Sequence, residues 1–136
     1  MADTIIVKSY TKGVDLSPRK VSLVASLVNR RTVADALVIL SHTPKRASLP
    51  VKKAIESARA NAINNHGLDA KTLVISTLSV TTGTRYKRFM PASRGRALPF
   101  EKKSSNILVE ISGELKLKKV TKKQSVENTD AKKEKK

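Results

Sequence analysis

Apolar residues follow two different spacings along this chain of 136 residues, and each spacing predicts one kind of secondary structure. In the first half they recur every three or four positions, as on one face of a helix. We expect three helices, which begin at Ser17-Pro18, Thr32 and Thr43-Pro44, with Gly67 ending the third and Pro50 kinking or restarting it. Their predicted core positions are Val21, Val24, Leu27, Val28, Ala36, Leu37, Leu40, Val51, Ile55, Ala58 and Ala62.

Three other stretches are typical of strands. Residues 4–10 and 73–80 are rich in β-branched side chains. In residues 106–112, Ile107, Val109 and Ile111 alternate with mostly polar neighbours, so one face is predicted to be buried. The sequence therefore predicts an α+β fold, with three helices packed on one face of a small three-stranded antiparallel sheet.

The last two predicted strands are separated by a long connection, residues 81–105. Such connections are uncommon in small domains and are usually functional or disordered. Pro91 and Pro99 argue against a regular central strand within it. An extended β-hairpin with arms of about eleven residues would project about 35 Å, at roughly 3.3 Å per residue. A mobile basic loop is the alternative that the sequence leaves open.

Charge changes this picture. The chain has 28 basic and 11 acidic residues, a formal net charge of +17 and a pI of about 10.5. From Arg85 to Arg96 there are five cations and no acid, with Tyr86 and Phe89 between them. An arm of this kind is stable only beside a polyanion, and RNA phosphates meet that need. No membrane partner is expected, because no stretch approaches roughly 20 apolar residues and the basic residues are not confined to one face of an amphipathic helix.

Composition also divides the chain near Gly113. Residues 1–113 carry nearly all of the periodic apolar pattern and are predicted to form one domain, including the possible hairpin at about residues 81–105. Residues 114–136 contain nine lysines and four acids and few apolar side chains. We expect a lysine-rich tail that is ordered only on a partner, or that serves solubility alone.

The residue types exclude several kinds of chemistry. Cysteine is absent, which excludes disulfides, cysteine-based zinc sites and thiol catalysis. The acids are scattered singly and the two histidines are far apart, so we predict no metal site, no cofactor, no small-molecule substrate and no enzyme such as a nuclease. The first ten residues resemble neither a signal nor a transit peptide, and a cytoplasmic protein is expected. A free basic protein that compacts DNA or chaperones RNA remains an alternative.

Ordered motifs along the chain resemble those of the bacterial type of large-subunit ribosomal protein L twenty-two. The resemblance covers roughly residues 5–112. The motifs are Ser17-Pro18-Arg19-Lys20-Val21, Thr43-Pro44-Lys45-Arg46-Ala47, Asn61-Ala62 with Asn65-His66-Gly67-Leu68, Lys87-Arg88-Phe89-Met90-Pro91 with Arg94-Gly95-Arg96-Ala97, and Lys102-Lys103-Ser104-Ser105. The chain departs from the family pattern at Ala92, Leu98-Pro99 and Glu101.

This resemblance implies a structural protein of the large ribosomal subunit in the cytoplasm. It implies binding to large-subunit (23S-type) rRNA, a role in subunit assembly, and a hairpin that lines the nascent-peptide exit tunnel opposite ribosomal protein L four. The implied rRNA-binding residues are Arg19, Lys20, Lys45, Arg46, Arg85, Lys87, Arg88, Arg94, Arg96, Lys102 and Lys103. Those implied to form a tunnel-lining hairpin tip, beside the nascent polypeptide, are Tyr86, Lys87, Arg88, Phe89, Met90, Pro91 and Gly95.

Overall fold

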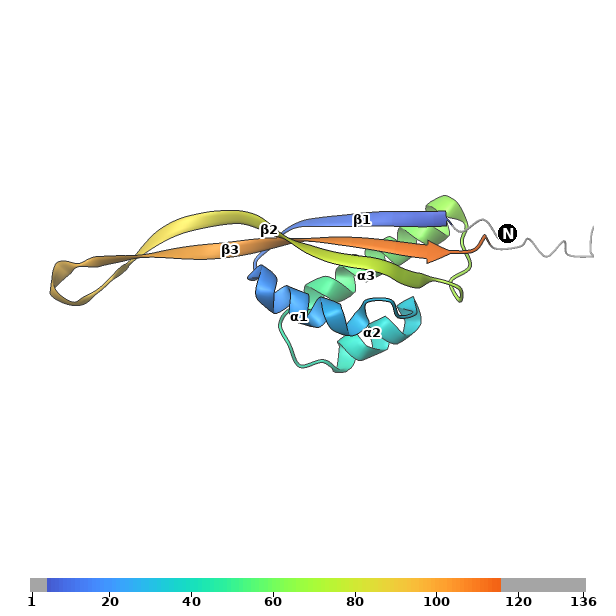
Figure 1. The fold of residues 1–136 in the computed structure, drawn as a ribbon, viewed down its shortest axis with the longest axis horizontal. Coiled ribbons are helices and arrows are strands. Elements are labelled where there is room, and N and C mark those ends of the chain that lie inside the picture. The colour runs from blue at the N-terminus through green and yellow to red at the C-terminus, as the bar shows by residue number, and fades with distance from the viewer. Residues whose placement is uncertain (1–4, 116–136) are drawn as a thin grey trace, which may run out of the picture.

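The computed structural model describes residues 5–115, and the predicted lysine-rich tail lies almost wholly outside this range. Three helices and three strands make up the described chain, which confirms the α+β class (Figure 1). In chain order the elements are β1 (Ile5–Val14), α1 (Pro18–Val28), α2 (Val33–His42), α3 (Ser48–His66), β2 (Val74–Pro91), a 3-10 turn (Ser93–Gly95) and β3 (Ala97–Gly113).

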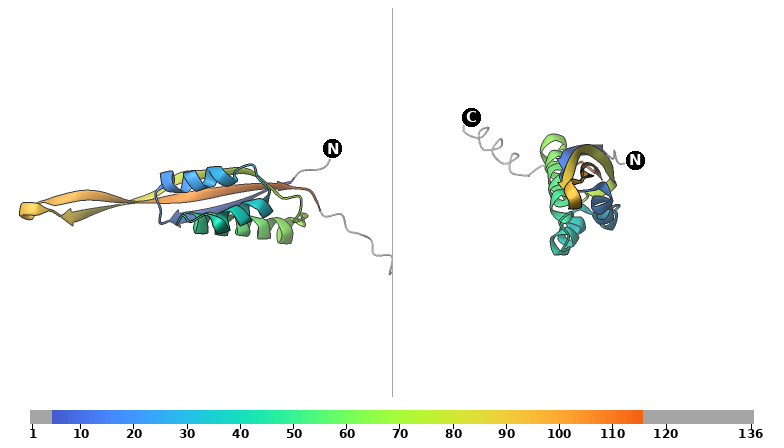
Figure 2. Two further views of the ribbon diagram at one scale, coloured as in Figure 1. Left: turned by 90° about the horizontal axis from the view of Figure 1, so that it is seen from below. Right: turned by 90° about the vertical axis from the view of Figure 1, so that its left-hand side faces the viewer.

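The sheet is antiparallel throughout, with the strand order β1-β3-β2. β3 therefore lies in the middle and pairs with both other strands. The helices lie on one side of the sheet, as the two further views show (Figure 2). One sheet face thus packs on the helices, whereas the other carries the half-exposed side chains of Ile6 and Tyr10.

The core lies between this sheet face and the helices. All four core positions predicted on α3 are buried, and so is the alternating set Ile107, Val109 and Ile111 on β3. The prediction for Leu27 is wrong, because its side chain is 49% exposed. Ala25 takes the buried place instead, which completes the helical stripe of Val21, Val24, Ala25 and Val28 and leaves Leu27 at its edge.

The third helix begins later than its sequence predicted. Residues 43–47 form a loop, and α3 starts at Ser48. Pro50 consequently lies in the first turn, where a helix needs no backbone N–H donor, so it neither kinks nor restarts α3. The predicted end is confirmed, because Gly67 has the left-handed φ of 63° and closes the helix.

Caps at the first two helices differ in kind. Ser17 occupies the N-cap position of α1, but its side chain makes no capping hydrogen bond. At α2, the Thr32 hydroxyl accepts a hydrogen bond from the Asp35 backbone N–H at 3.2 Å and donates one to the Asp35 carboxylate at 2.7 Å. The capping pattern predicted at Thr32 is therefore confirmed.

Both long strands continue beyond the three-stranded sheet. β1 last pairs with β3 at Val14–Ser105, whereas β2 and β3 stay paired from Arg85–Lys103 out to Pro91–Ala97. The strands are therefore longer than predicted and form an arm that extends from the domain (Figure 1). Its paired part is about 20 Å long at roughly 3.3 Å per residue.

Prolines fit in this arm because each of its strands has a free edge. Pro99 lies opposite Phe89, and Pro91 lies opposite Ala97 at the end of the ladder. Between Ser105 and the turn, neither β2 nor β3 has a neighbouring strand on its outer side. A proline, which lacks a backbone N–H donor, can therefore turn that position outward without the loss of a ladder hydrogen bond. The prolines argued against a regular central strand in this segment, and both of them indeed lie in a two-stranded ladder, where neither strand is central.

Candidate nucleic-acid interface

The paired part of β2 and β3 beyond the domain, residues 85–103, is called the hairpin below. Because side chains alternate across a strand, its register assigns them to two faces. One face carries Arg85, Lys87, Phe89, Pro91, Ala97, Pro99, Glu101 and Lys103. The other carries Tyr86, Arg88, Met90, Leu98, Phe100 and Lys102.

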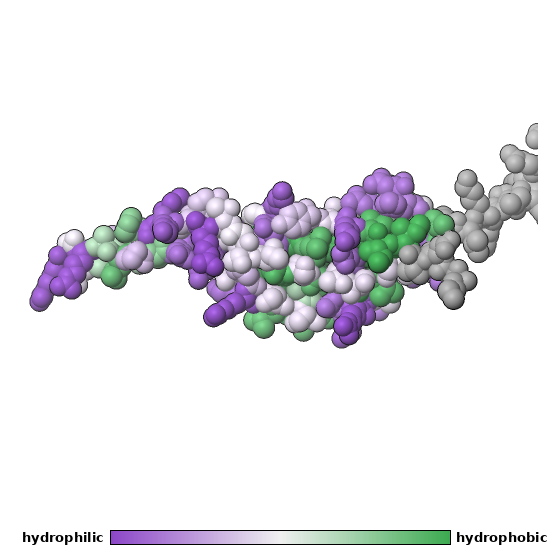
Figure 3. All heavy atoms as spheres, turned by 45° about the horizontal axis from the view of Figure 1, so that its top comes forward, coloured by the Kyte–Doolittle hydropathy of each residue, from purple (hydrophilic) through white to green (hydrophobic). Residues whose placement is uncertain are grey.

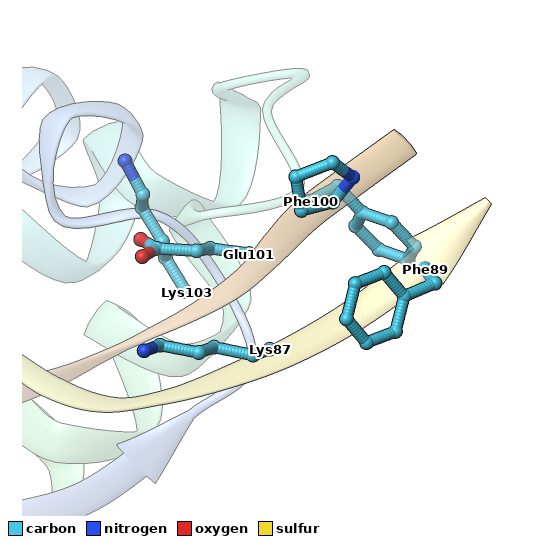
Figure 4. Close-up of a pocket in the computed structure, with 6 residues that line it drawn as sticks. Lys87, Phe89, Phe100, Glu101 and Lys103 are labelled. Atoms are coloured by element: carbon cyan, nitrogen blue, oxygen red, sulfur yellow. The ribbon is translucent and has the colours of Figure 1, made fainter. Parts of the chain in front are cut away.

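Charge and apolar surface form successive zones along the hairpin. Hydrophilic side chains gather near the domain and at the far end, with a hydrophobic band between them (Figure 3). The band consists of exposed side chains on both strands, namely Phe89, Met90, Leu98 and Phe100. Beside it is a hollow of about 520 Å³, where Phe89 and Phe100 lie at one end and Lys87, Glu101 and Lys103 at the other (Figure 4).

Most of the hairpin cations have no acidic partner among the described residues. The Arg85 guanidinium lies 3.8 Å from the Glu101 carboxylate, and the Lys102 ammonium lies 2.9 Å from the Asp15 carboxylate. Within residues 5–115, no carboxylate lies within 4.0 Å of the other five, which are Lys87, Arg88, Arg94, Arg96 and Lys103. All five are exposed, so their charge is open to an external anion.

One cation lies over an aromatic ring. The Arg88 guanidinium is 5.7 Å from the centroid of Tyr86, within the range of a cation–π contact. Both side chains are exposed on the same hairpin face. Arginine planes and aromatic rings are the surfaces on which unpaired bases stack.

The far end of the hairpin is a tight turn formed by residues 92–96. The backbone N–H of Ala92 donates to the Arg96 carbonyl at 2.7 Å, and Arg94 and Gly95 both have positive φ. Of the residues predicted at the tip, only Gly95 lies in this turn, and residues 86–91 precede it on β2. The pairing of Pro91 with Ala97 fixes the turn here, which the sequence did not reveal.

Three of the predicted rRNA-binding residues on the domain lie in one groove, which the sequence did not show. Lys20 on α1 and Lys45 and Arg46 in the loop before α3 line one groove of about 430 Å³. Arg19 is exposed but is not among the residues lining this groove. Sequence reasoning missed Leu23, which is 71% exposed at the groove, although its position outside the buried stripe of α1 was a usable signal.

No group of His, Cys, Asp or Glu side chains in residues 5–115 is arranged to hold a metal ion. None of the three helices has the length and apolar character needed to cross a membrane.

A small domain with a cation-rich hairpin is typical of basic proteins that bind RNA. Comparison with known families makes this specific. The family model described as Ribosomal protein L22p/L17e matches residues 9–112, and the chain belongs to this family.

Curated relatives are similar over most of the chain, and three are named "Large ribosomal subunit protein uL22". The chain is 44% identical to the one from Metamycoplasma arthritidis over 82% of its own length and 55% of the relative's. It is 46% identical to that from Metamycoplasma hominis over 71% and 75%, and 41% identical to that from Mesoplasma florum over 79% and 96%. The chain thus spans about half the length of the Metamycoplasma arthritidis relative.

Proposed function

We propose that this chain is a structural constituent of the large ribosomal subunit in the cytoplasm, where it binds large-subunit rRNA and supports subunit assembly. Membership of a ribosomal protein family and the names of three relatives support this proposal. The family is one of structural proteins, so the chain is not an enzyme. The rRNA-binding residues are the exposed cations of the hairpin and of the groove.

The observation that carries this proposal is the set of five hairpin cations that have no carboxylate partner within residues 5–115. A two-stranded ladder alone is only marginally stable in water, and repulsion among like charges weakens it further. Phosphates that surround the hairpin remove this repulsion and release counterions. A structured RNA offers phosphates on several sides at once, which fits an arm with charge on both faces.

The hairpin has a second part in this proposal. Its outer half lines the exit tunnel for nascent polypeptide, opposite ribosomal protein L four, as the family resemblance implies. The exposed band of Phe89, Met90, Leu98 and Phe100 supports contacts with unpaired bases and with the passing peptide, since both present apolar surface. The turn with Arg94 and Arg96 then extends beyond this band among phosphates.

Sedimentation of cell extract in moderate salt tests the assignment to the ribosome. We expect a tagged chain to sediment with the large subunit. A free DNA-compacting or RNA-chaperone protein, which shares the charge, would stay in the soluble fraction, and this result would refute the proposal.

A salt titration tests how the hairpin binds. The full chain should prefer folded large-subunit rRNA to duplex DNA, and equal affinity for the two would count against the proposal. The double variant Lys87→Ala with Arg88→Ala should make the slope of log affinity against log salt shallower by about 1.5, at roughly 0.7–0.9 per lost phosphate contact. The matched control, Lys53→Ala with Arg59→Ala on α3, removes equal charge from exposed positions outside the hairpin and should change the slope little.

A further inference from the structure

The groove between α1 and the loop before α3 combines an apolar floor with a basic rim. Leu16, Leu23, Val24, Leu27 and Ala47 supply the floor. Lys20, Lys45 and Arg46 stand at the rim, and no acidic residue in the described part of the chain lines the groove. Leu23 and Leu27 are 71% and 49% exposed, so the floor is open to a ligand.

The rim is held in place by its own hydrogen bonds. The Lys45 backbone N–H donates to the Thr43 carbonyl at 2.8 Å, and the Ser48 hydroxyl donates to the same carbonyl at 3.0 Å. The Thr43 hydroxyl in turn donates to the Ile39 carbonyl at the end of α2 at 2.7 Å. The loop that carries Lys45 and Arg46 is therefore fixed before any ligand binds, which lowers the entropy cost of binding.

None of the three rim cations forms an ion pair within residues 5–115. A ligand that fits must cover aliphatic side chains and present negative charge at both sides of them. An unpaired nucleotide does both, because its base has an apolar face and a phosphate precedes and follows it. A nucleotide also uses all three cations, whereas a purely apolar ligand would leave them desolvated without a partner.

We infer that this groove holds an unpaired RNA nucleotide, with its base against Leu23 and Leu27 and its flanking phosphates on Lys20, Lys45 and Arg46. The inference rests on the proposed function, and it adds a mode of recognition to it. The domain then binds a base that is unpaired and lies outside its RNA helix, in addition to RNA phosphates. Two motifs that lie far apart in the sequence, Ser17–Lys20 and Thr43–Arg46, thus act on one nucleotide.

Photo-crosslinking in assembled large subunits tests this inference. Three variants of the full chain each carry one p-azidophenylalanine. It replaces Leu23 in the first variant and Leu27 in the second, and in the third it replaces Val38 on α2, an exposed control position. We expect both groove positions to crosslink to one rRNA nucleotide, and Lys45→Ala with Arg46→Ala to lower the yield severalfold. The Val38 position should not label that nucleotide.

The outcomes separate the inference from the proposed function. A crosslink from the groove to a protein overturns the inference and leaves the ribosomal assignment intact. The same holds if neither groove position labels RNA while p-azidophenylalanine at Arg88 does. If the chain is absent from large subunits, the proposed function fails, and the inference fails with it.

Binding to synthetic strands gives a second measurement that does not depend on assembly. The probes are a single-stranded 12-mer of adenylate and an abasic strand of the same length, each bound to the full chain. The variant Leu23→Ser with Leu27→Ser should bind the adenylate strand about tenfold more weakly, equivalent to about 1.4 kcal/mol. Its affinity for the abasic strand should not change. Equal effects on both strands, or no effect on either, would overturn the inference.

Discussion

Substitution of Gly83 by alanine perturbs the point where the hairpin leaves the sheet. The register between β2 and β3 shifts between Thr82 and Arg85, so Gly83 lies in a bulge. An added Cβ would lie 2.5 Å from the Ser104 hydroxyl oxygen, 3.1 Å from the Ser104 carbonyl carbon and 3.2 Å from the Ser105 nitrogen. The last two atoms belong to the backbone of β3 and cannot rotate away.

The expected cost follows from these contacts. The Ser104 hydroxyl donates to the Thr84 carbonyl at 2.7 Å, and its displacement would forfeit about 1 kcal/mol. Separation of the two strands adds about 1–3 kcal/mol, as for other overpacked sites. Gly83 does not have a positive φ, so alanine brings no backbone strain and lowers the entropy of the unfolded chain by about 0.4–1 kcal/mol. We therefore expect Gly83→Ala to lower the free energy of unfolding by about 2–3 kcal/mol.

Urea unfolding of the full chain, followed by circular dichroism, measures this change. Thr82→Ala is the matched control, because Thr82 is an exposed neighbour on the same strand, and it should cost less than about 1 kcal/mol. In a Ser104→Ala background, Gly83→Ala should cost about 1 kcal/mol less, since the hydroxyl contact is already gone. A Gly83→Ala variant as stable as the wild type would refute the close packing of the two strands at this bulge.

Three further predictions concern the helices, the core and the hairpin charge. Thr32→Ala removes the side-chain cap of α2 and should lower the free energy of unfolding by about 1 kcal/mol, whereas Ser17→Ala, at an N-cap without such a bond, should change it by less than about 0.5 kcal/mol in the same urea assay. Ile55→Ala in the core should cost about 2–5 kcal/mol, and a loss no larger than that of the exposed Leu49→Ala would contradict the assigned burial. Glu101→Gln removes the carboxylate of the hairpin and should raise its affinity for rRNA about two- to fivefold at low salt. This gain in affinity should vanish near 1 M salt, and a gain that persists there would show that the effect is not electrostatic.

Much of the fold could be predicted because local patterns and tertiary packing agree. The stripe of α3 and the alternation of Ile107, Val109 and Ile111 are both buried as predicted. The exceptions arise where several apolar residues of one helix could be buried and tertiary packing decides which of them is. Leu27 has the right spacing for the core of α1, yet the smaller Ala25 is buried, because the contact surface is centred between Val21 and Val28.

Strand ends were harder to predict than strands. Sequence alone does not show that β1 ends at Val14, opposite Ser105 of β3, and this boundary decides where β2 and β3 become a two-stranded ladder. The same long-range pairing places the turn at residues 92–96, so residues 86–91 precede the turn on β2. Such pairings are non-local and leave no periodic signal in the chain.

The proposed nucleotide groove also depends on contacts that the sequence does not reveal. Lys20, Lys45 and Arg46 were predicted as rRNA-binding residues, but nothing in the sequence indicates that they share one cavity. Their meeting depends on how α1 packs beside the loop between α2 and α3, which is a property of the whole core. Leu23, a large apolar side chain outside the buried stripe of α1, was a signal in the sequence that this surface binds a ligand.

The base of the hairpin at Ser105 and its charged outer part are stabilised in different ways. At the base, Ser105 is buried and pairs with both Val14 and Thr82, so the direction of the hairpin is set by the packed sheet. Beyond it, the two-stranded ladder buries little surface and gathers cations, so it gains stability only from outside. In the proposed complex, the bound RNA therefore supplies free energy that holds the hairpin, while the domain supplies its orientation. Binding and hairpin stability are thus thermodynamically linked, and a hairpin variant that weakens rRNA binding need not destabilise the isolated domain.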